Sequence, residues 1–413
     1  MVHYFTSITP NYLAKARVLC KTLKQHNPDC RFFLGLTGDV PEGVNPAAEP
    51  FDAILLTSEL DLIPQKDIFF FNHTITEICT AVKPALALTI MQKYHAQKVV
   101  YLDPDIMVFS HLGELETLLD SHSMIFTPHQ TDFEDDDSYV VSNEILFLKR
   151  GTYNLGFFAV KADETGLRFL NWWHSRVMLY CFDDDYELIK VLEPLGLLGL
   201  FTDQKWIDLV PAFFDGYYIL KNAGYNVSTW NMTKRKIRKV SDDSYTINDQ
   251  PLMFFHFSGF DAKGHHNEMQ RALTYDSENS DAAQLSAHYE SELEINGQSI
   301  VEKIPHKYAR YSNGQLITKV ERKLLHVRKD VWEHFPDPFE VKEGFCYYNW
   351  VRAEYGRFLK QSDEYRASKK LLNALFPPDT ARRRGIRKLK QIFYSLLRII
   401  SASLIRKEYR IPK

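Results

Sequence analysis

Two carboxylates directly follow an apolar run about a quarter of the way along the chain. The segment from Val99 to Phe109 reads VVYLDPDIMVF, in which Asp103 and Asp105 stand one residue apart. Its β-branched, aromatic and aliphatic residues predict a buried strand. Ligands of open α/β sheets bind at the carboxyl ends of the strands. The sequence therefore predicts that both acids lie at the mouth of a sheet.

Acids at such an edge are costly to desolvate unless they are paired or hold a metal. Their oxygen atoms suit a hard cation such as Mg²⁺ or Mn²⁺. The alternative interpretation is that Asp103-Pro104-Asp105 forms a solvated turn that caps the next segment. A D-x-D pair by itself does not decide between these interpretations.

The first 120 residues alternate short apolar runs with helical patterns, which predicts βαβ units. The fold class expected is α/β, with a Rossmann-like, mostly parallel central sheet flanked by helices. Strands are expected at 3–8, 30–36, 51–56, 99–102, 124–127 and 154–160, and short strand-like pieces at 225–230 and 253–257. Helices are expected at 11–26, 75–94, 114–119 and 166–181, a further helix from 204, and a solvated acidic loop at 132–137.

Three regions follow one another along the chain. Residues 1–265 carry the α/β pattern, and a polar run ends it. Residues 266–378 are helical in composition and predict an appended helical extension, connected with acceptor binding or assembly. Pro377-Pro378-Asp379 then breaks the chain before residues 379–413.

The last region is strongly basic. From Ala381 to Lys413 eleven Lys and Arg stand against one acid, a net +10 that leaves −13 for the rest of a chain of net charge −3. Apolar residues recur there at three- and four-residue steps, which predicts a basic amphipathic helix. Such helices lie on anionic membrane surfaces, although packing on the protein is the alternative. The apolar stripe and the acidic remainder argue against nucleic acid as a partner.

The composition places the chain in a reducing, aqueous compartment. With 413 residues, 45% hydrophobic and 25% charged, it is typical of a soluble globular protein. The five cysteines are scattered, so neither a disulfide framework nor a zinc site is indicated. Residues 1–30 lack a signal-peptide pattern, and no stretch reaches the ~18 apolar residues that span a bilayer. A cytoplasmic location, peripheral to the inner face of the cell membrane, is expected.

Five short segments together resemble a known family. YLDPDIMVF, NLGFFAV, FTDQKWID, YNVSTWNM and HFSGF occur in the order found in GT-A fold nucleotide-sugar glycosyltransferases. The chain is most similar to the retaining enzymes of glycosyltransferase family 8 and its relatives. The resemblance covers roughly residues 1–265, and it implies a GT-A domain there.

The resemblance implies a metal site that bridges the donor diphosphate. The D-x-D acids and a later histidine bind the cation in that family, which matches Asp103, Asp105 and His256 here. Gly259 and Lys263 match a phosphate-contacting element, although the family lysine comes one position earlier. The implied cofactor is Mn²⁺ or Mg²⁺. Taken alone, a histidine such as His256 between two phenylalanines is more often a buried structural histidine.

The resemblance also implies donor contacts elsewhere. Residues after the first strand contact the nucleoside, and a basic side chain before the acidic strand reaches the donor; the matching residues are Thr6, Ser7, Tyr12 and Lys83. Tyr12 and Lys83 could equally be ordinary surface residues. The N-x-G loop corresponds to Asn154 and Gly156, where glycine lets the backbone approach the sugar.

The remaining matches concern the reacting sugar. Asp203 and Gln204 correspond to the pair that orients the donor sugar and stabilises an oxocarbenium-like transition state, and they are the predicted catalytic residues. Trp230 and Asn231 are candidates for the acceptor side, although a buried core Trp is the commoner outcome.

The resemblance thus implies a metal-dependent, retaining glycosyltransferase that uses a UDP-sugar. Its acceptor would be a glycan or a lipid-linked saccharide in surface polysaccharide synthesis. A sugar nucleotidyltransferase is one alternative, but residues 6–11 contain no glycine for a phosphate loop. A non-catalytic membrane scaffold with a degenerate transferase fold is the other.

Overall fold

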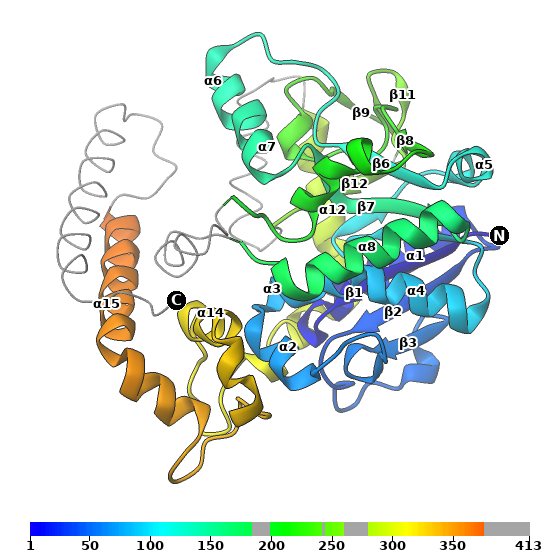
Figure 1. Cartoon of the computed structure of the whole chain (residues 1–413). Helices are drawn as coiled ribbons and strands as arrows, with labels where there is room; N and C mark the ends of the chain where they lie inside the picture. The colour runs from blue at the N-terminus through cyan, green and yellow to red at the C-terminus, as the bar shows by residue number, and fades with distance from the viewer. Residues whose placement is uncertain (184–198, 242–243, 260–279, 376–413) are drawn as a thin grey trace.

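A seven-stranded sheet forms the centre of the computed structural model, which describes residues 1–183, 199–241, 244–259 and 280–375 (Figure 1). The strand order is β3-β2-β1-β4-β7-β6-β8. The strands are β1 (His3–Ile8), β2 (Arg31–Leu36), β3 (Ala53–Leu56), β4 (Lys98–Leu102), β6 (Met124–Pro128), β7 (Tyr153–Lys161) and β8 (Tyr217–Ile219).

The sheet is mostly parallel. Strands β3, β2, β1 and β4 pair in parallel, with His3 opposite Arg31 in β2 and Val99 in β4. Strand β7 runs antiparallel to both β4 and β6, and β8 is again parallel to β6. The predicted α/β class with a mostly parallel sheet is confirmed.

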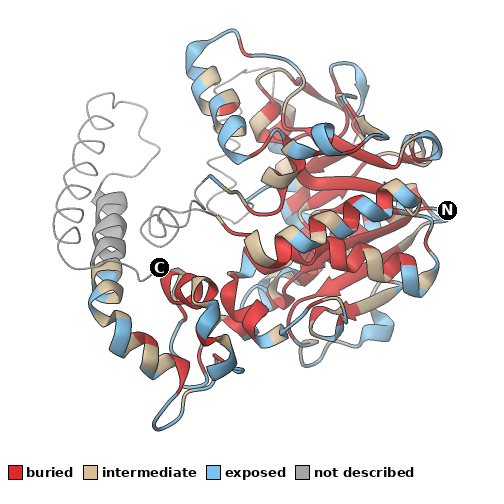
Figure 2. Cartoon of the chain, in the orientation of Figure 1, coloured by how far each residue is buried: buried red, intermediate tan, exposed pale blue. Residues whose placement is uncertain are grey.

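Helices cover both faces of the sheet. Because side chains alternate along a strand, Tyr101 faces a core shared with α4 (Lys83–Tyr94) and α8 (Glu164–Tyr180). Val100 faces the opposite core, shared with α1 (Leu13–His26) and α5 (Gly113–Ser121). The central strands are buried on both sides (Figure 2), which explains their continuous apolar runs.

Two small sheets extend this core. β5 (Ile106–Val108) pairs antiparallel with β12 (Phe254–His256), and β9 (Ile237–Ser241), β10 (Ser244–Ile247) and β11 (Gln250–Pro251) form a meander. Helix α12 (Ser280–Ile295) packs on this part, where the Tyr289 ring stacks on Phe257 at 3.9 Å between centroids. The first helix of the extension is therefore joined to the α/β unit by core packing.

The rest of the extension packs on helices of the α/β unit. Helices α13 (Gln298–Val301), α14 (Lys319–Val327) and α15 (Tyr347–Leu375) follow, and α15 projects away from the body (Figure 1). α14 shares an aromatic core with α2 (Lys66–Asn72). The predicted helical extension is confirmed, whereas the basic segment 379–413 lies outside the described residues. No helix in the described ranges is long and apolar enough to cross a membrane.

Three local predictions need correction. The helix expected at 75–94 is two helices, α3 (Ile75–Ala81) and α4, with Pro84 in the first turn of α4, where its missing N–H costs nothing. Residues 225–230 form no strand; they contain a bridge from Val227 to Phe255 and a 3-10 turn, η8 (Thr229–Asn231). The helix expected from 204 is the 3-10 helix η7 (Gln204–Leu209), followed by α10 (Val210–Phe213). Helices α6 (Asp137–Tyr139) and α7 (Ile145–Arg150) follow the acidic loop.

Candidate metal and donor site

The two acids of the D-x-D pair lie on the turn between β4 and β5. Strand β4 ends at Leu102, and the Asp103 N–H donates to the carbonyl of Gly156 at 2.8 Å. The Ile106 N–H then donates to the carbonyl of Asp103 at 3.1 Å, which turns the chain into β5. Both carboxylates therefore sit at the carboxyl end of a central strand, as predicted.

Strand pairing brings His256 to the same place. It ends β12 opposite Ile106 of β5, and the Phe257 N–H donates to the carbonyl of Asp105 at 2.8 Å. His256, which lies 151 positions after Asp105 in the sequence, is thus fixed beside the turn by two backbone interactions. Because of this register, three residues that are far apart in the sequence form one cluster in space.

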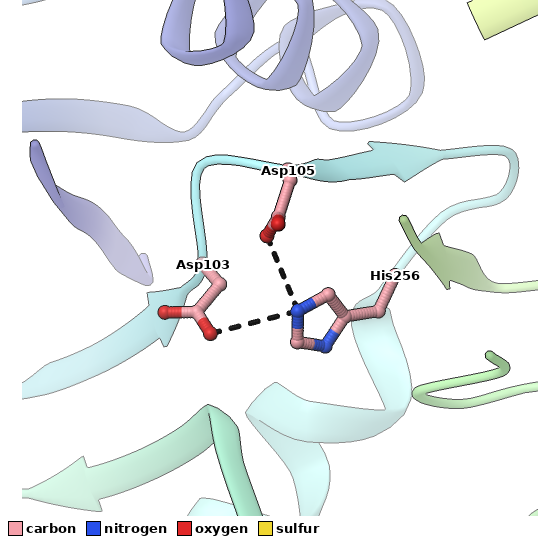
Figure 3. Close-up of side chains that lie close together, drawn as sticks. All are labelled: Asp103, Asp105 and His256. Carbon is pink, nitrogen blue, oxygen red and sulfur yellow. Dashed lines mark ion pairs between the residues drawn. The ribbon is translucent and has the colours of Figure 1, made fainter. Parts of the chain in front are cut away.

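The three side chains point toward one another (Figure 3). The Nε2 atom of His256 lies 3.2 Å from Asp105 Oδ1 and 3.6 Å from Asp103 Oδ2. One ligand atom from each residue falls within 4.8 Å of the others, so the set could hold one cation. Two carboxylate oxygens and one imidazole nitrogen suit Mn²⁺ or Mg²⁺.

The imidazole of His256 is oriented by Asn226, a residue that the sequence did not single out. Asn226 donates from Nδ2 to Asn154 Oδ1 and Thr127 Oγ1, so its Oδ1 accepts from His256 Nδ1 at 3.2 Å. This fixes the tautomer that leaves Nε2 free for a metal. Asn226 has φ of 51°, a left-handed conformation that Asn tolerates. Its place in the YNVSTWNM segment was the only available signal.

Gly156 provides space for the same ring. A Cβ on Gly156 would lie 2.3 Å from His256 Cε1 and 2.7 Å from Asn154 Oδ1. The Gly156 N–H also donates to Asn154 Oδ1 at 3.0 Å. Both predicted N-x-G residues therefore contact His256 or the residue that orients it. The space that the His256 ring needs is a second reason for glycine at position 156, besides the predicted approach of the sugar.

The acids and the histidine perturb each other. Burial raises the pKa of Asp105, but the His256 ring outweighs it and holds the pKa of Asp105 below its usual value. Burial lowers the pKa of His256, but Asp105 and then Asp103 outweigh it and raise the pKa of the imidazole. The histidine thus serves as the counter-charge of the two acids, a position that a divalent cation can take over.

Lys83 links these acids to the predicted catalytic pair. Its Nζ lies 3.0 Å from Asp203 Oδ2 and 3.7 Å from Asp103 Oδ1, and it donates to the carbonyl of Leu155 at 2.8 Å. The side chain is only 2% exposed, so the surface-residue alternative for Lys83 is wrong. The Tyr101 hydroxyl donates to Asp103 Oδ1 at 2.6 Å.

Asp203 is buried, and its neighbour Gln204 is held by backbone. Burial raises the pKa of Asp203, although Lys83 opposes the shift, and for Lys83 burial is outweighed by Asp103 and Asp203, which raise its pKa. Gln204 Nε2 donates to the carbonyl of Arg150 at 3.0 Å, and the Leu155 N–H approaches Gln204 Oε1 at 3.5 Å. The amide of Gln204 therefore ties α7 and the start of β7 to the loop that carries Asp203.

The predicted nucleoside residues lie at the end of β1 and just beyond it. Thr6 and Ser7 are buried in the strand, whereas Tyr12 in η1 (Pro10–Tyr12) is 38% exposed. The Lys15 ammonium lies 4.4 Å above the Tyr12 ring, so one face of this ring already contacts a cation. Tyr12 is the member of this group that presents a surface suited to stacking.

Of the remaining predicted residues, three lie in the described part of the chain and one lies outside it. Gly259, three residues after the end of β12, has φ of 68°, which favours glycine, while Lys263 lies outside the described residues. Trp230 packs edge-on to His256 at 5.1 Å between centroids. Asn231 donates to the carbonyls of His129 and Asn226 and is 1% exposed, so its side chain serves the local backbone.

Comparison with other proteins adds distant likenesses. No protein-family model matches the chain. Two uncharacterized proteins of Bacillus subtilis (strain 168), YfnD and YfnF, are each 25% identical, over 194 and 275 residues. These matches cover 46% and 62% of this chain, and the chain spans 55% of the length of YfnD and 81% of that of YfnF.

Several solved structures of glycosyltransferases also resemble the chain. The galactosyltransferase LgtC in complex with donor and acceptor sugar analogs is 18% identical, with a TM-score of 0.37 and coverage of 66% of this chain and 96% of LgtC. The glycosyltransferase GlyE of Streptococcus pneumoniae TIGR4 is 15% identical, with a TM-score of 0.32 and coverage of 75% and 66%. A glycosyltransferase involved in glycosylation of the major capsid of PBCV-1 is 10% identical, with a TM-score of 0.34 and coverage of 66% and 98%.

Proposed function

We propose that this chain is a metal-dependent glycosyltransferase that uses a nucleotide-sugar donor. The observation that carries the proposal is the convergence of Asp103, Asp105 and His256 at the carboxyl end of β4, beside the buried Lys83–Asp203 ion pair. A cation site and a fixed lysine at one sheet edge provide positive charge where a diphosphate leaving group develops negative charge. The donor is a UDP-sugar in this proposal, and Mn²⁺ or Mg²⁺ is the ion.

Each part has a defined task in such a transfer. Asp103, Asp105 and His256 would hold the divalent cation, which would supply Lewis-acid stabilisation of the departing diphosphate. Lys83 is held rigidly by Leu155 and Asp203, so it offers a charge that need not reorganise during the reaction. Asp203 and Gln204 are the proposed catalytic residues, and their loop is fixed by Gln204 against the start of β7.

The finer parts of the proposal rest on the sequence resemblance. They are retention of the anomeric configuration, a glycan or lipid-linked acceptor, and a role in surface polysaccharide synthesis. Thr6, Ser7, Tyr12, Asn154, Gly156, Gly259 and Lys263 complete the proposed donor site. A GT-A domain at 1–265, an extension at 266–378 and a membrane-contacting segment at 379–413, on the cytoplasmic side, complete the proposed organisation.

The test measures release of UDP from a set of UDP-sugars with and without Mn²⁺. We expect metal-dependent release from one donor, and a fall of about 10²-fold or more in Asp105→Asn, since a charged group on the departing phosphates is worth that much. Asp39→Asn, at a surface carboxylate that is 73% exposed, is the matched control and should retain full activity.

Different results separate the alternatives. Release of pyrophosphate from a nucleoside triphosphate and a sugar phosphate would indicate a nucleotidyltransferase. Absence of metal-dependent nucleotide chemistry with every donor would favour the scaffold. The anomeric configuration of the product, read by NMR, decides between retention and inversion.

A further inference from the structure

A second cavity lies next to the proposed catalytic loop, outside the metal cluster. It has a volume of about 390 Å³, within the range of small-ligand sites. One wall comes from the start of α3, including Thr76, and another from Phe201 and Thr202. The third wall comes from the extension, through Ala309 and Leu316. Segments more than 200 residues apart thus build one hollow.

One residue of the cavity wall, Thr202, contacts the proposed donor site. The residue adopts a left-handed conformation with φ of 45°, and its Oγ1 donates to Asp203 Oδ1 at 3.2 Å. Asp203 in turn pairs with Lys83, which reaches the metal ligand Asp103. One residue therefore lies on the cavity wall and touches the proposed catalytic carboxylate.

Buried charges hold the walls together, so the cavity is preformed. Lys323 Nζ lies 3.0 Å from Glu77 Oε2, and both side chains are at most 2% exposed. Glu77 Oε1 accepts from the Asp183 N–H at 3.0 Å. Arg322 donates to the carbonyls of Phe70, Phe71 and His73 and to that of Tyr308. These contacts fasten α14 to α3 and to the residues just before it.

The lining suits a saccharide. Phe201, Leu316 and Ile317 offer apolar surface to the C–H faces of a pyranose, while threonine hydroxyls offer hydrogen-bond partners for its hydroxyls. Two basic residues, Lys319 and Arg322, line the cavity together with two acids, Glu77 and Asp183. The lining is therefore neither fully apolar nor strongly basic, which disfavours an acyl chain or a phosphate.

We infer that this cavity binds the acceptor saccharide, and that residues 309–317 of the helical extension form one side of the acceptor subsite. The inference rests on the proposed transferase function. The extension would then take a direct part in acceptor choice, because a sugar bound in the cavity would touch both the α/β unit and the extension.

Two filling substitutions, one on each wall, test this. Thr76→Trp and Leu316→Trp place a large ring in the cavity from exposed positions, Leu316 being 61% exposed, so folding should be retained. Ile300→Trp, at a position 76% exposed on α13 and outside the lining, is the matched control. Thermal unfolding verifies each variant, and either wall suffices if the other variant fails to fold.

The probes are methyl hexosides and disaccharides. Their binding is measured by saturation-transfer NMR in the presence of UDP and Mn²⁺. We expect at least one to bind the wild type and Ile300→Trp, and to bind about tenfold or more weakly to the cavity variants. UDP binding and donor hydrolysis by water should stay within about twofold in all of them. Unchanged saccharide binding in a folded cavity variant, or no binding of any probe to the wild type, would overturn the inference.

The proposed function fails in a different way. Its failure would show as absence of metal-dependent UDP binding in the wild type. If UDP binding and hydrolysis are intact and saccharide binding is unchanged in both Thr76→Trp and Leu316→Trp, only the acceptor subsite is refuted.

Discussion

Charge is buried in two places at the same end of the sheet, and its partners differ. In the clamp, formed by Glu77, Arg322 and Lys323, each charge meets an opposite charge or several carbonyls. In the metal cluster, Asp103, Asp105 and His256 converge on a common point. Buried charge with complete partners joins segments of a fold. Acids that converge on one point are arranged for a cation that arrives from outside.

The largest expected effect comes from breaking the clamp. Lys323→Met leaves the Glu77 carboxylate buried without its partner, which should lower the free energy of unfolding by about 3–5 kcal/mol. Urea unfolding measures it. Lys342→Met, at an exposed pair with Glu340, should leave the unfolding midpoint unchanged. A Lys323→Met protein as stable as the wild type would show that the clamp does not hold the extension.

A smaller effect is expected from Asn226, which orients the proposed metal ligand His256. Asn226→Gly removes the amide that orients His256 while permitting the left-handed backbone. Loss of such a second contact typically weakens a metal site about 10–100-fold. Mn²⁺ affinity, measured by titration, should fall by that factor in a protein that still unfolds cooperatively, with a lower midpoint because Thr127 and Asn154 also lose a buried partner. Unchanged Mn²⁺ affinity would mean that Asn226 serves only the fold.

The comparison also explains how far the sequence could predict the site. The D-x-D acids follow an apolar strand, so their position needed only local pattern. The clamp could not be foreseen, because Glu77 and Lys323 are 246 positions apart and each is unremarkable in its own segment. Lys83 was placed on one long helix, and only the break after Ala81 reveals that it begins a new helix and points inward.

The smallest expected effect concerns pH. Burial lowers the pKa of His73 to about 4, and it lowers the pKa of His326 well below its ordinary value. The unfolded chain therefore takes up protons first below pH 6.5, so stability falls as pH falls from there, by up to about 1.4 kcal/mol per pH unit for each histidine. The raised pKa of His256 acts with the opposite sign, because it favours the folded state below its unfolded pKa and that gain is lost as pH rises.

Urea unfolding between pH 7 and pH 5 tests this sign. His326→Phe keeps a ring among Tyr180 and Phe182 and should flatten the slope by one proton. The exposed His334→Phe should leave the slope as it is. A slope in His326→Phe equal to that of the wild type would show that His326 does not titrate across this transition.

The central claim is that Asp103, Asp105 and His256 hold a cation that binds a nucleoside diphosphate. Calorimetric titration with UDP, GDP and dTDP, each with and without Mn²⁺, tests it most directly when Asp105→Asn is measured in parallel. We predict that UDP binds in a Mn²⁺-dependent manner and that the variant loses this binding while it still unfolds cooperatively in urea. Nucleotide binding that is absent, or that is equal with and without Mn²⁺ and in the variant, would contradict the claim.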